Sequence, residues 1–232
     1  MAGGSSRWPS STAAWPPRRR ATTTDVRDRN RRRGDRGVRF PRAGVWGARV
    51  SGTVDARGYL DSQPTERRIP DALEEIRRRV EAGGRRIAVL DDDPTGTQTV
   101  HGVPVLTTWS VEDLRWALEQ PSPTFYVLTN SRSLPEEEAV AMNREVATNL
   151  AAAAERTGTD FVVTSRGDST LRGHFPAETD ALAEGLGGGI DGVILCPCYL
   201  EAGRLTADDT HWVRQGERLV PAGETEFARD AS

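Results

Sequence analysis

The residues best suited to chemistry lie in one short segment, Ser165–His174, which directly follows the apolar run Phe161–Val163. The segment contains two arginines, an aspartate, hydroxyl side chains and two glycines. Guanidinium groups hold carboxylates and phosphates through paired hydrogen bonds, and hydroxyl and carboxylate groups bind sugar hydroxyls. The segment therefore indicates a site for a small, anionic, hydroxylated molecule.

A second polar segment, Asp91–Thr97, follows the apolar run Ile87–Leu90. Three adjacent carboxylates repel one another, so Asp91, Asp92 and Asp93 are costly unless a cation or hydroxyl donors use them. One interpretation is a solvated turn, because Asp-Pro-Thr-Gly is good turn chemistry. The other is a ligand loop at the end of a buried strand.

The order Asp91-x-Asp93-x-Thr95 also resembles the nucleophile motif of haloacid-dehalogenase-type phosphatases. That family uses a lysine against the phosphoryl charge, and all 31 basic residues of this chain are arginine. The absence of lysine weakens the phosphatase interpretation. It also excludes P-loop and Schiff-base mechanisms, which need a lysine.

Arginines recur where predicted strands end. Arg132, Arg166, Arg172 and Arg204 all fall in such loops, and together they favour an anion site over unrelated surface ion pairs. His174 is interpreted as a local hydrogen-bonding group. We expect Cys196 and Cys198 to be reduced and packed, since they are too close for an ordinary disulfide and too few for a zinc site.

Helical and strand patterns alternate from about Pro70 onward. They predict an α/β fold: a mainly parallel, twisted sheet with helices on both faces, plus a C-terminal β-hairpin. In such sheets ligands bind beyond the carboxyl ends of the strands, where the polar segments lie. The expected strands are Ile87–Leu90, Val103–Thr107, Phe125–Thr129, Phe161–Thr164 and Gly192–Cys196, and the expected hairpin joins 211–213 to 218–220.

The chain divides by charge into two segments. Residues 1–60 hold 14 Arg against 4 acidic residues, and the rest hold 17 Arg against 30 acidic residues. We expect residues 1–60 to be a disordered Arg-rich extension and residues 61–232 to be the folded domain. A nucleic-acid-binding arm and an organelle transit peptide are the other interpretations of the extension.

The sequence also limits where the protein is expected to reside and what it is expected to bind. No apolar run approaches the ~20 residues that cross a bilayer, and the N-terminus lacks the apolar core of a secretory signal. We expect a cytoplasmic protein with neither a membrane nor a nucleic acid as partner. The stretch Gly187-x-Gly189-x-x-Gly192 precedes a predicted strand, so it does not predict a dinucleotide site. We expect no metal site in the chain.

Taken together, the motifs resemble the N-terminal domain of the four-carbon acid sugar kinases. The resemblance runs from about Ile87 to Asp230 and rests on motifs that are specific in combination. They are Asp92-Asp93-Pro94-Thr95-Gly96, Asn130-Ser131-Arg132, Arg166-Gly167-Asp168-Ser169-Thr170-Leu171-Arg172-Gly173, Glu201-Ala202-Gly203-Arg204 and Thr225-Glu226-Phe227-Ala228-Arg229-Asp230.

The resemblance implies a transferase of carbohydrate metabolism that phosphorylates threonate, erythronate or 3-oxo-tetronate with ATP and Mg²⁺. Asp92 or Asp93 would orient or deprotonate the accepting hydroxyl, as an aspartate does in protein kinases. The remaining implied substrate-binding residues are Arg132, Arg166, Gly167, Asp168, Ser169, Arg172 and Arg204.

In this family a separate C-terminal domain holds the nucleotide, and no ATP site is evident in the present sequence. The expectation is therefore the substrate-binding half of a kinase, inactive without a nucleotide domain that a separate gene could encode. The alternatives are the phosphatase that uses Asp91 and Asp93, and a non-enzymatic sensor of acid sugars.

Overall fold

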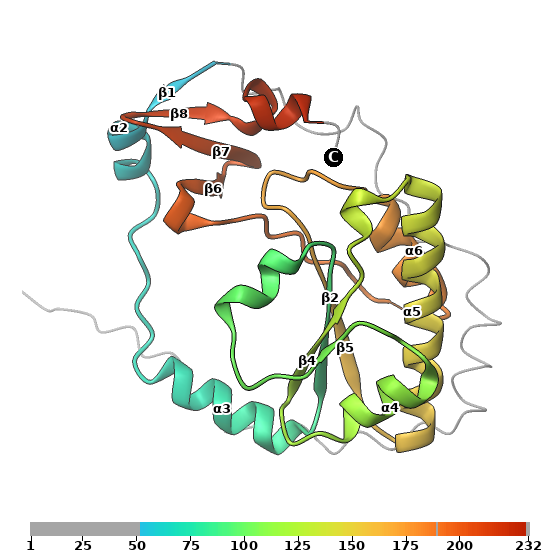
Figure 1. The fold of residues 1–232 in the computed structure, drawn as a ribbon. Helices are drawn as coiled ribbons and strands as arrows, with labels where there is room; N and C mark the ends of the chain where they lie inside the picture. The colour runs from blue at the N-terminus through green and yellow to red at the C-terminus, as the bar shows by residue number, and fades with distance from the viewer. Residues whose placement is uncertain (1–51, 189, 231–232) are drawn as a thin grey trace, which may run out of the picture. The chain divides into compact units, whose positions relative to one another are not determined.

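The computed structural model describes residues 52–188 and 190–230, which form two four-stranded sheets (Figure 1). The parallel sheet has the strand order β3-β4-β2-β5. Its strands are β2 (Arg86–Asp91), β3 (Val105–Leu106), β4 (Thr124–Leu128) and β5 (Phe161–Arg166). This arrangement confirms the predicted α/β class.

Three helices cover one face of the parallel sheet: α4 (Val111–Glu119), α5 (Glu136–Thr157) and α6 (Ala177–Gly185). Ser110 begins α4 with a capping box, in which its side chain and that of Asp113 bond each other's backbone N–H groups. The core between these helices and the sheet is mainly apolar, although the buried Asn143 of α5 donates to Glu178 of α6 at 2.8 Å. Its fully buried members include Ala88, Leu114, Phe125, Val127, Val146 and Leu150.

The other face of the sheet is only partly covered. Side chains alternate along a strand, so Tyr126 and Leu128 point away from the core that receives Phe125 and Val127. Neither Tyr126 nor Leu128 is fully buried. None of the residues of helix α3 (Ala72–Gly83) is buried. The expected layer of helices on both faces is thus complete on one face only.

The antiparallel sheet contains the predicted hairpin, β7 (Thr210–Gln215) with β8 (Arg218–Pro221), and β6 (Arg204–Ala207) beside β7. Its fourth strand is β1 (Val54–Asp55), which pairs with β8 and leads into α2 (Ala56–Asp61). Residues 52–60 are therefore folded, and the predicted domain boundary at residue 60 is wrong. The rest of the predicted extension, residues 1–51, lies outside the described residues.

A small apolar cluster explains why this short segment folds. Trp212 is fully buried, and Ala56 and Leu219 are buried against it. The Tyr59 ring lies 5.2 Å from the Trp212 ring, centroid to centroid, and its hydroxyl donates to Asp208 at 2.7 Å. Local composition does not reveal this packing, because the partners are about 150 residues further along the chain.

The prediction of a strand at Gly192–Cys196 is also wrong. These residues have no strand pairing, and β5 is the last strand on its side of the parallel sheet. Ile194 is 93% exposed, so the apolar run Val193–Leu195 is not a core strand. Both cysteines are free thiols and exposed, which corrects the expectation that they pack. An apolar run shows that a segment is hydrophobic, but it does not show whether another strand pairs with that segment.

Among the described residues, no helix has the length and apolar character required to span a bilayer.

Replacing the buried indole tests the folded boundary. We expect Trp212→Ala to lower the free energy of unfolding by about 3–5 kcal/mol, because the truncation removes the centre of the cluster that holds β1 and α2. Trp116, which is 50% exposed on α4, provides the control. Trp116→Ala should change stability by less than about 0.5 kcal/mol in urea unfolding followed by circular dichroism. Equal effects of the two variants would contradict the packing.

The exposed thiols make a second prediction. Both cysteines should react with Ellman's reagent in the native protein, and Cys198 should react more slowly near neutral pH. Desolvation and the neighbouring Cys196 raise the pKa of the Cys198 thiol, and only the thiolate reacts. The single variants Cys196→Ser and Cys198→Ser assign the two rates. A reaction that needs denaturant would show that the segment is packed.

Candidate functional site

The strand register brings the predicted site loops together. Asp91, at the end of β2, lies opposite Leu128 on β4 and Arg166 on β5. Backbone hydrogen bonds continue beyond the strands: the Thr129 N–H donates to the Asp91 carbonyl at 2.9 Å, and the Asp92 N–H donates to the Arg166 carbonyl at 3.2 Å. The loops after three adjacent strands therefore meet at one edge of the sheet.

Asp92 and Arg132 form a bidentate ion pair at this edge. Arg132 donates through Nε at 3.0 Å and through Nη2 at 2.8 Å to the two oxygens of Asp92. The Asp92 side chain is only 7% exposed, and the Arg132 side chain 14%. Such a bidentate pair fixes both side chains, since the planar fork matches the carboxylate. Asp92 is thus largely occupied by its protein partner.

Arg166 is held more loosely. Its Nη1 donates to Asp91 Oδ1 at 3.2 Å and to the Asp93 carbonyl at 3.4 Å, and its Nη2 donates to Thr95 Oγ1 at 3.3 Å. These distances are at the long end of the hydrogen-bond range. The Arg166 side chain is 32% exposed, the most of the four site arginines. Its guanidinium is therefore the one most open to a ligand.

Asp93 begins the 3₁₀ helix Pro94–Thr99. Its Oδ1 accepts the Thr95 N–H at 2.9 Å, and its Oδ2 lies 3.4 Å from Arg132 Nη1. The hydrogen bonds from Thr95 and the charge of Arg132 lower the pKa of Asp93, so this carboxyl is ionised at neutral pH. Its side chain is 27% exposed, which makes it the more accessible of the two predicted catalytic aspartates.

Asp168 organises the other half of the site. It accepts from Arg172 Nε at 2.9 Å, from Arg204 Nη1 at 3.4 Å and from the Thr170 hydroxyl. Burial opposes ionisation of Asp168, but the hydrogen bonds from Arg172 and Thr170 outweigh it and hold its pKa well below the usual range. Arg204 Nη1 also donates to Ser169 Oγ at 3.1 Å. Because Arg204 begins β6, this contact links the antiparallel sheet to the loop after β5.

Two residues near the C-terminus complete this half of the site. The guanidinium carbon of Arg204 lies 4.4 Å above the Phe227 ring centroid, and that of Arg172 lies at 5.4 Å. Arg172 Nη1 also donates to Asp230 at 2.9 Å. No role of Phe227 or Asp230 was predicted from the sequence. Both belong to the motif 225–230, which supported the family resemblance but did not indicate what its side chains contact.

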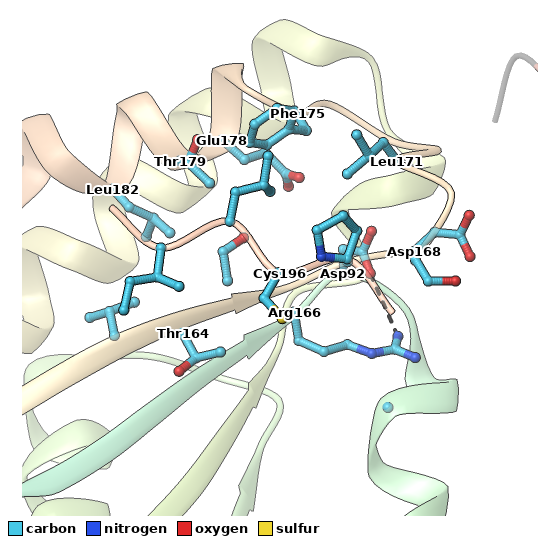
Figure 2. Close-up of a pocket in the computed structure, with 18 of the residues that line it drawn as sticks. Asp92, Thr164, Arg166, Asp168, Leu171, Phe175, Glu178, Thr179, Leu182 and Cys196 are labelled. Atoms are coloured by element: carbon cyan, nitrogen blue, oxygen red, sulfur yellow. Dashed lines mark ion pairs between the residues drawn. The ribbon is translucent and has the colours of Figure 1, made fainter. Parts of the chain in front are cut away.

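All nine predicted site residues line one cavity of about 2480 Å³ (Figure 2). Figure 2 shows Arg166 extending from β5 beside Asp92, with Thr164, Leu182 and Cys196 also on the cavity wall. The structure thus brings the predicted residues together from both sheets. They are Asp92, Asp93, Arg132, Arg166, Gly167, Asp168, Ser169, Arg172 and Arg204.

Asp91 and His174, which the sequence also singled out, are not among these nine residues. Asp91 is fully buried and does not line the cavity, so its carboxylate has no access to a substrate phosphorus atom. This burial argues against the phosphatase interpretation. His174 does line the cavity, and its Nε2 lies 2.8 Å from the Leu134 carbonyl oxygen. That contact agrees with its interpretation as a local hydrogen-bonding group.

Among residues 52–188 and 190–230, no group of three or more His, Cys, Asp or Glu side chains is arranged to hold a metal ion. We therefore assign no chemical step to Mg²⁺ at this site.

The structure is an α/β domain in which charged and polar side chains from two sheets line one cavity. The family model described as the sugar-binding N-terminal domain matches residues 87–232, and the chain belongs to that family. This match confirms the predicted resemblance to the N-terminal domain of the four-carbon acid sugar kinases.

One solved structure shows a partial likeness. It is the crystal structure of a domain of unknown function, DUF1537, from Bordetella bronchiseptica, a domain-swapped dimer with bound citrate. The sequences are 27% identical, the TM-score is 0.49, and the match covers 62% of this chain. It covers 35% of that chain, so the present chain matches about a third of the neighbour's length. No curated protein matches the chain.

Removing the Asp168 charge tests the network around it. We expect Asp168→Asn to lower the free energy of unfolding at pH 7 by about 2–3 kcal/mol, because Arg172 and Arg204 lose their shared carboxylate. The folded-state pKa of Asp168 is depressed, so its stabilisation is present above the unfolded pKa and disappears as pH falls below about 4. The difference between the two proteins should shrink over that range in urea unfolding.

The matched control is Glu112→Gln, which removes an exposed partner of Arg156 on the surface. It should change stability by less than about 0.5 kcal/mol at any pH. If Asp168→Asn behaves like this control, Asp168 does not organise the site.

Proposed function

We propose that this site binds a four-carbon sugar acid, such as threonate, erythronate or 3-oxo-tetronate, as the phosphoryl acceptor of a kinase. The observation that carries the proposal is the convergence of nine predicted residues, eight of them charged or polar, from two sheets on one cavity. The family description, a sugar-binding N-terminal domain, supports the same class of ligand.

Arg166 is the best candidate to receive the carboxylate of the ligand. Its three hydrogen bonds to the protein are long and leave further N–H donors, since a guanidinium carries five. Arg132, by contrast, already satisfies a carboxylate with two short hydrogen bonds. Arg132 therefore fixes the position of Asp92, and Arg166 is free to exchange weak contacts for a charge-assisted pair with the ligand.

The ligand hydroxyls would meet acceptors on both sides of Arg166. Asp93 and Asp168 are ionised near neutral pH and accept from hydroxyl groups, and Ser169 can both donate and accept. Asp93 is the better placed to orient an accepting hydroxyl, because it is more exposed than Asp92 and lacks a bidentate partner. We assign it that role in phosphoryl transfer.

The donor in the complete family enzyme would be ATP, with Mg²⁺, held by a nucleotide domain. We propose that this chain supplies the substrate-binding half and that phosphorylation requires such a domain as a partner. A sensor of acid sugars would use the same binding site without transfer. Release of ADP on mixing the chain, the acid, ATP and a family nucleotide domain would support the kinase; binding without any release would favour the sensor.

Binding itself is tested by calorimetry at pH 7 with threonate, erythronate and 3-oxo-tetronate. We expect Arg166→Ala to weaken binding by about ten- to a hundred-fold, because a charge-assisted hydrogen bond contributes ~1.5–3 kcal/mol. Arg144→Ala is the matched control, since Arg144 pairs with Glu184 and does not line the cavity. It should bind like the wild type. If no acid binds, or if Arg166→Ala binds equally well, the proposed site is wrong.

A further inference from the structure

The residue of interest is Asp91, which lies beneath the cavity at the end of β2. Its side chain is fully buried, under the 3₁₀ helix Pro94–Thr99. Gly96 of that helix lies so close that an added Cβ would collide with both carboxylate oxygens of Asp91. The glycine therefore allows the 3₁₀ helix to close directly over a carboxyl group.

Asp91 is paired on one side only. Its Oδ1 accepts from Arg166 Nη1 at 3.2 Å, while its Oδ2 is buried with no hydrogen-bond partner. An ionised carboxylate has two acceptor oxygens that both need donors, so this environment serves the charged form poorly. The site thus holds an acid whose charge is only partly compensated, in direct contact with the arginine most open to the ligand.

We infer that Asp91 is a positioning residue whose gain or loss of a proton sets how strongly Arg166 attracts the carboxylate of the ligand. The inference rests on the proposed function. When Asp91 is ionised, it draws Arg166 into an internal ion pair and offsets its charge. When Asp91 is protonated, that charge is available to the ligand, and the guanidinium can turn toward the cavity.

The charged groups around Asp91 determine the pH range of this change. Desolvation raises the pKa of Asp91 to about 6; Arg166 acts against the rise, and Asp92 and Asp93 add to it. From β4, Thr129 contacts only the backbone carbonyl of Asp91, and its hydroxyl carries no charge at these pH values. Arg132 is paired with Asp92 and affects Asp91 only indirectly, through that carboxylate. Asp93, whose pKa is lowered, stays ionised over the same range.

The direction of the linkage follows from these charges. An anion on Arg166 favours protonated Asp91, so binding takes up a proton when the pH is near or above 6. The carboxyl of the ligand, with an ordinary pKa, is ionised throughout the range above pH 5.5. Affinity should therefore be greatest near pH 5.5. It should fall above pH 6 by up to about tenfold per pH unit.

The experiment is calorimetry of threonate binding to the wild-type protein at pH 5.5, 6.5, 7.5 and 8.5. Each measurement is repeated in two buffers that differ in ionisation enthalpy, because the difference in observed heat counts the protons taken up. We expect uptake that grows above pH 6. Asp91→Asn keeps the shape of the side chain but cannot titrate. It should bind without proton uptake and lose less than about twofold in affinity between pH 5.5 and 8.5.

Histidine is the other side-chain type whose ordinary pKa lies close to this range, so two histidine variants provide the controls. His174→Gln removes the histidine that lines the cavity, and His211→Gln removes one that lies near Arg204 and Asp168. Both variants should keep the wild-type dependence of affinity on pH.

A second measurement needs no ligand: it is the ¹³C NMR titration of labelled aspartates. The resonance that is lost in Asp91→Asn should have its midpoint near pH 6. Arg166→Gln should move that midpoint upward, because the opposing charge is removed.

The outcomes separate the two proposals. Failure of every acid to bind at any pH would overturn the proposed function together with this inference. Binding that does not change with pH, or that keeps its slope in Asp91→Asn, would overturn this inference alone. An Asp91 resonance that titrates near pH 4 would do the same.

Discussion

The parallel register of β2 with β4 and β5 is the constraint on which the site depends. It sets Asp91 opposite Arg166, so the loops that follow all three strands leave the sheet at the same level. Asp92 and Arg132 come from loops 40 residues apart, yet they meet with two short hydrogen bonds. A shift by one residue would turn these side chains to the opposite face of the sheet, because side chains alternate along a strand.

So much charge can gather at one edge of the parallel sheet because the charged side chains pair with one another. Each site arginine has a carboxylate partner before any ligand arrives, and Asp168 serves both Arg172 and Arg204. The contact from Arg204 also ties β6 to the loop after β5, so one carboxylate joins the two sheets at the cavity. Such preorganised charges need little rearrangement when a ligand exchanges one internal contact for another.

Local patterns were sufficient for much of this architecture. Apolar runs followed by Asp, Asn, Ser and Arg indicated strands with functional ends, and all nine predicted residues line the cavity. Contacts that depend on distant partners left no such signal. Trp212 packs against β1 and α2, which belong to a segment whose composition suggested disorder. Phe227 stacks on two arginines that are distant from it in the sequence. The segment Val193–Leu195 shows the opposite error, since its apolar pattern had no strand to pair with.

The charge balance of the site argues for a polyhydroxylated ligand. The ion pairs of the site involve five carboxylates and four guanidinium groups. Because this network of charges has one more carboxylate than guanidinium, a simple anion would meet little net attraction there. Hydroxyl groups change this balance, because they donate to the carboxylates while the ligand's own carboxylate occupies an arginine. A sugar acid offers both groups in one small molecule, whereas a phosphate or a plain carboxylic acid offers only the anion. The network consists of Asp91, Asp92, Asp93, Asp168, Asp230, Arg132, Arg166, Arg172 and Arg204.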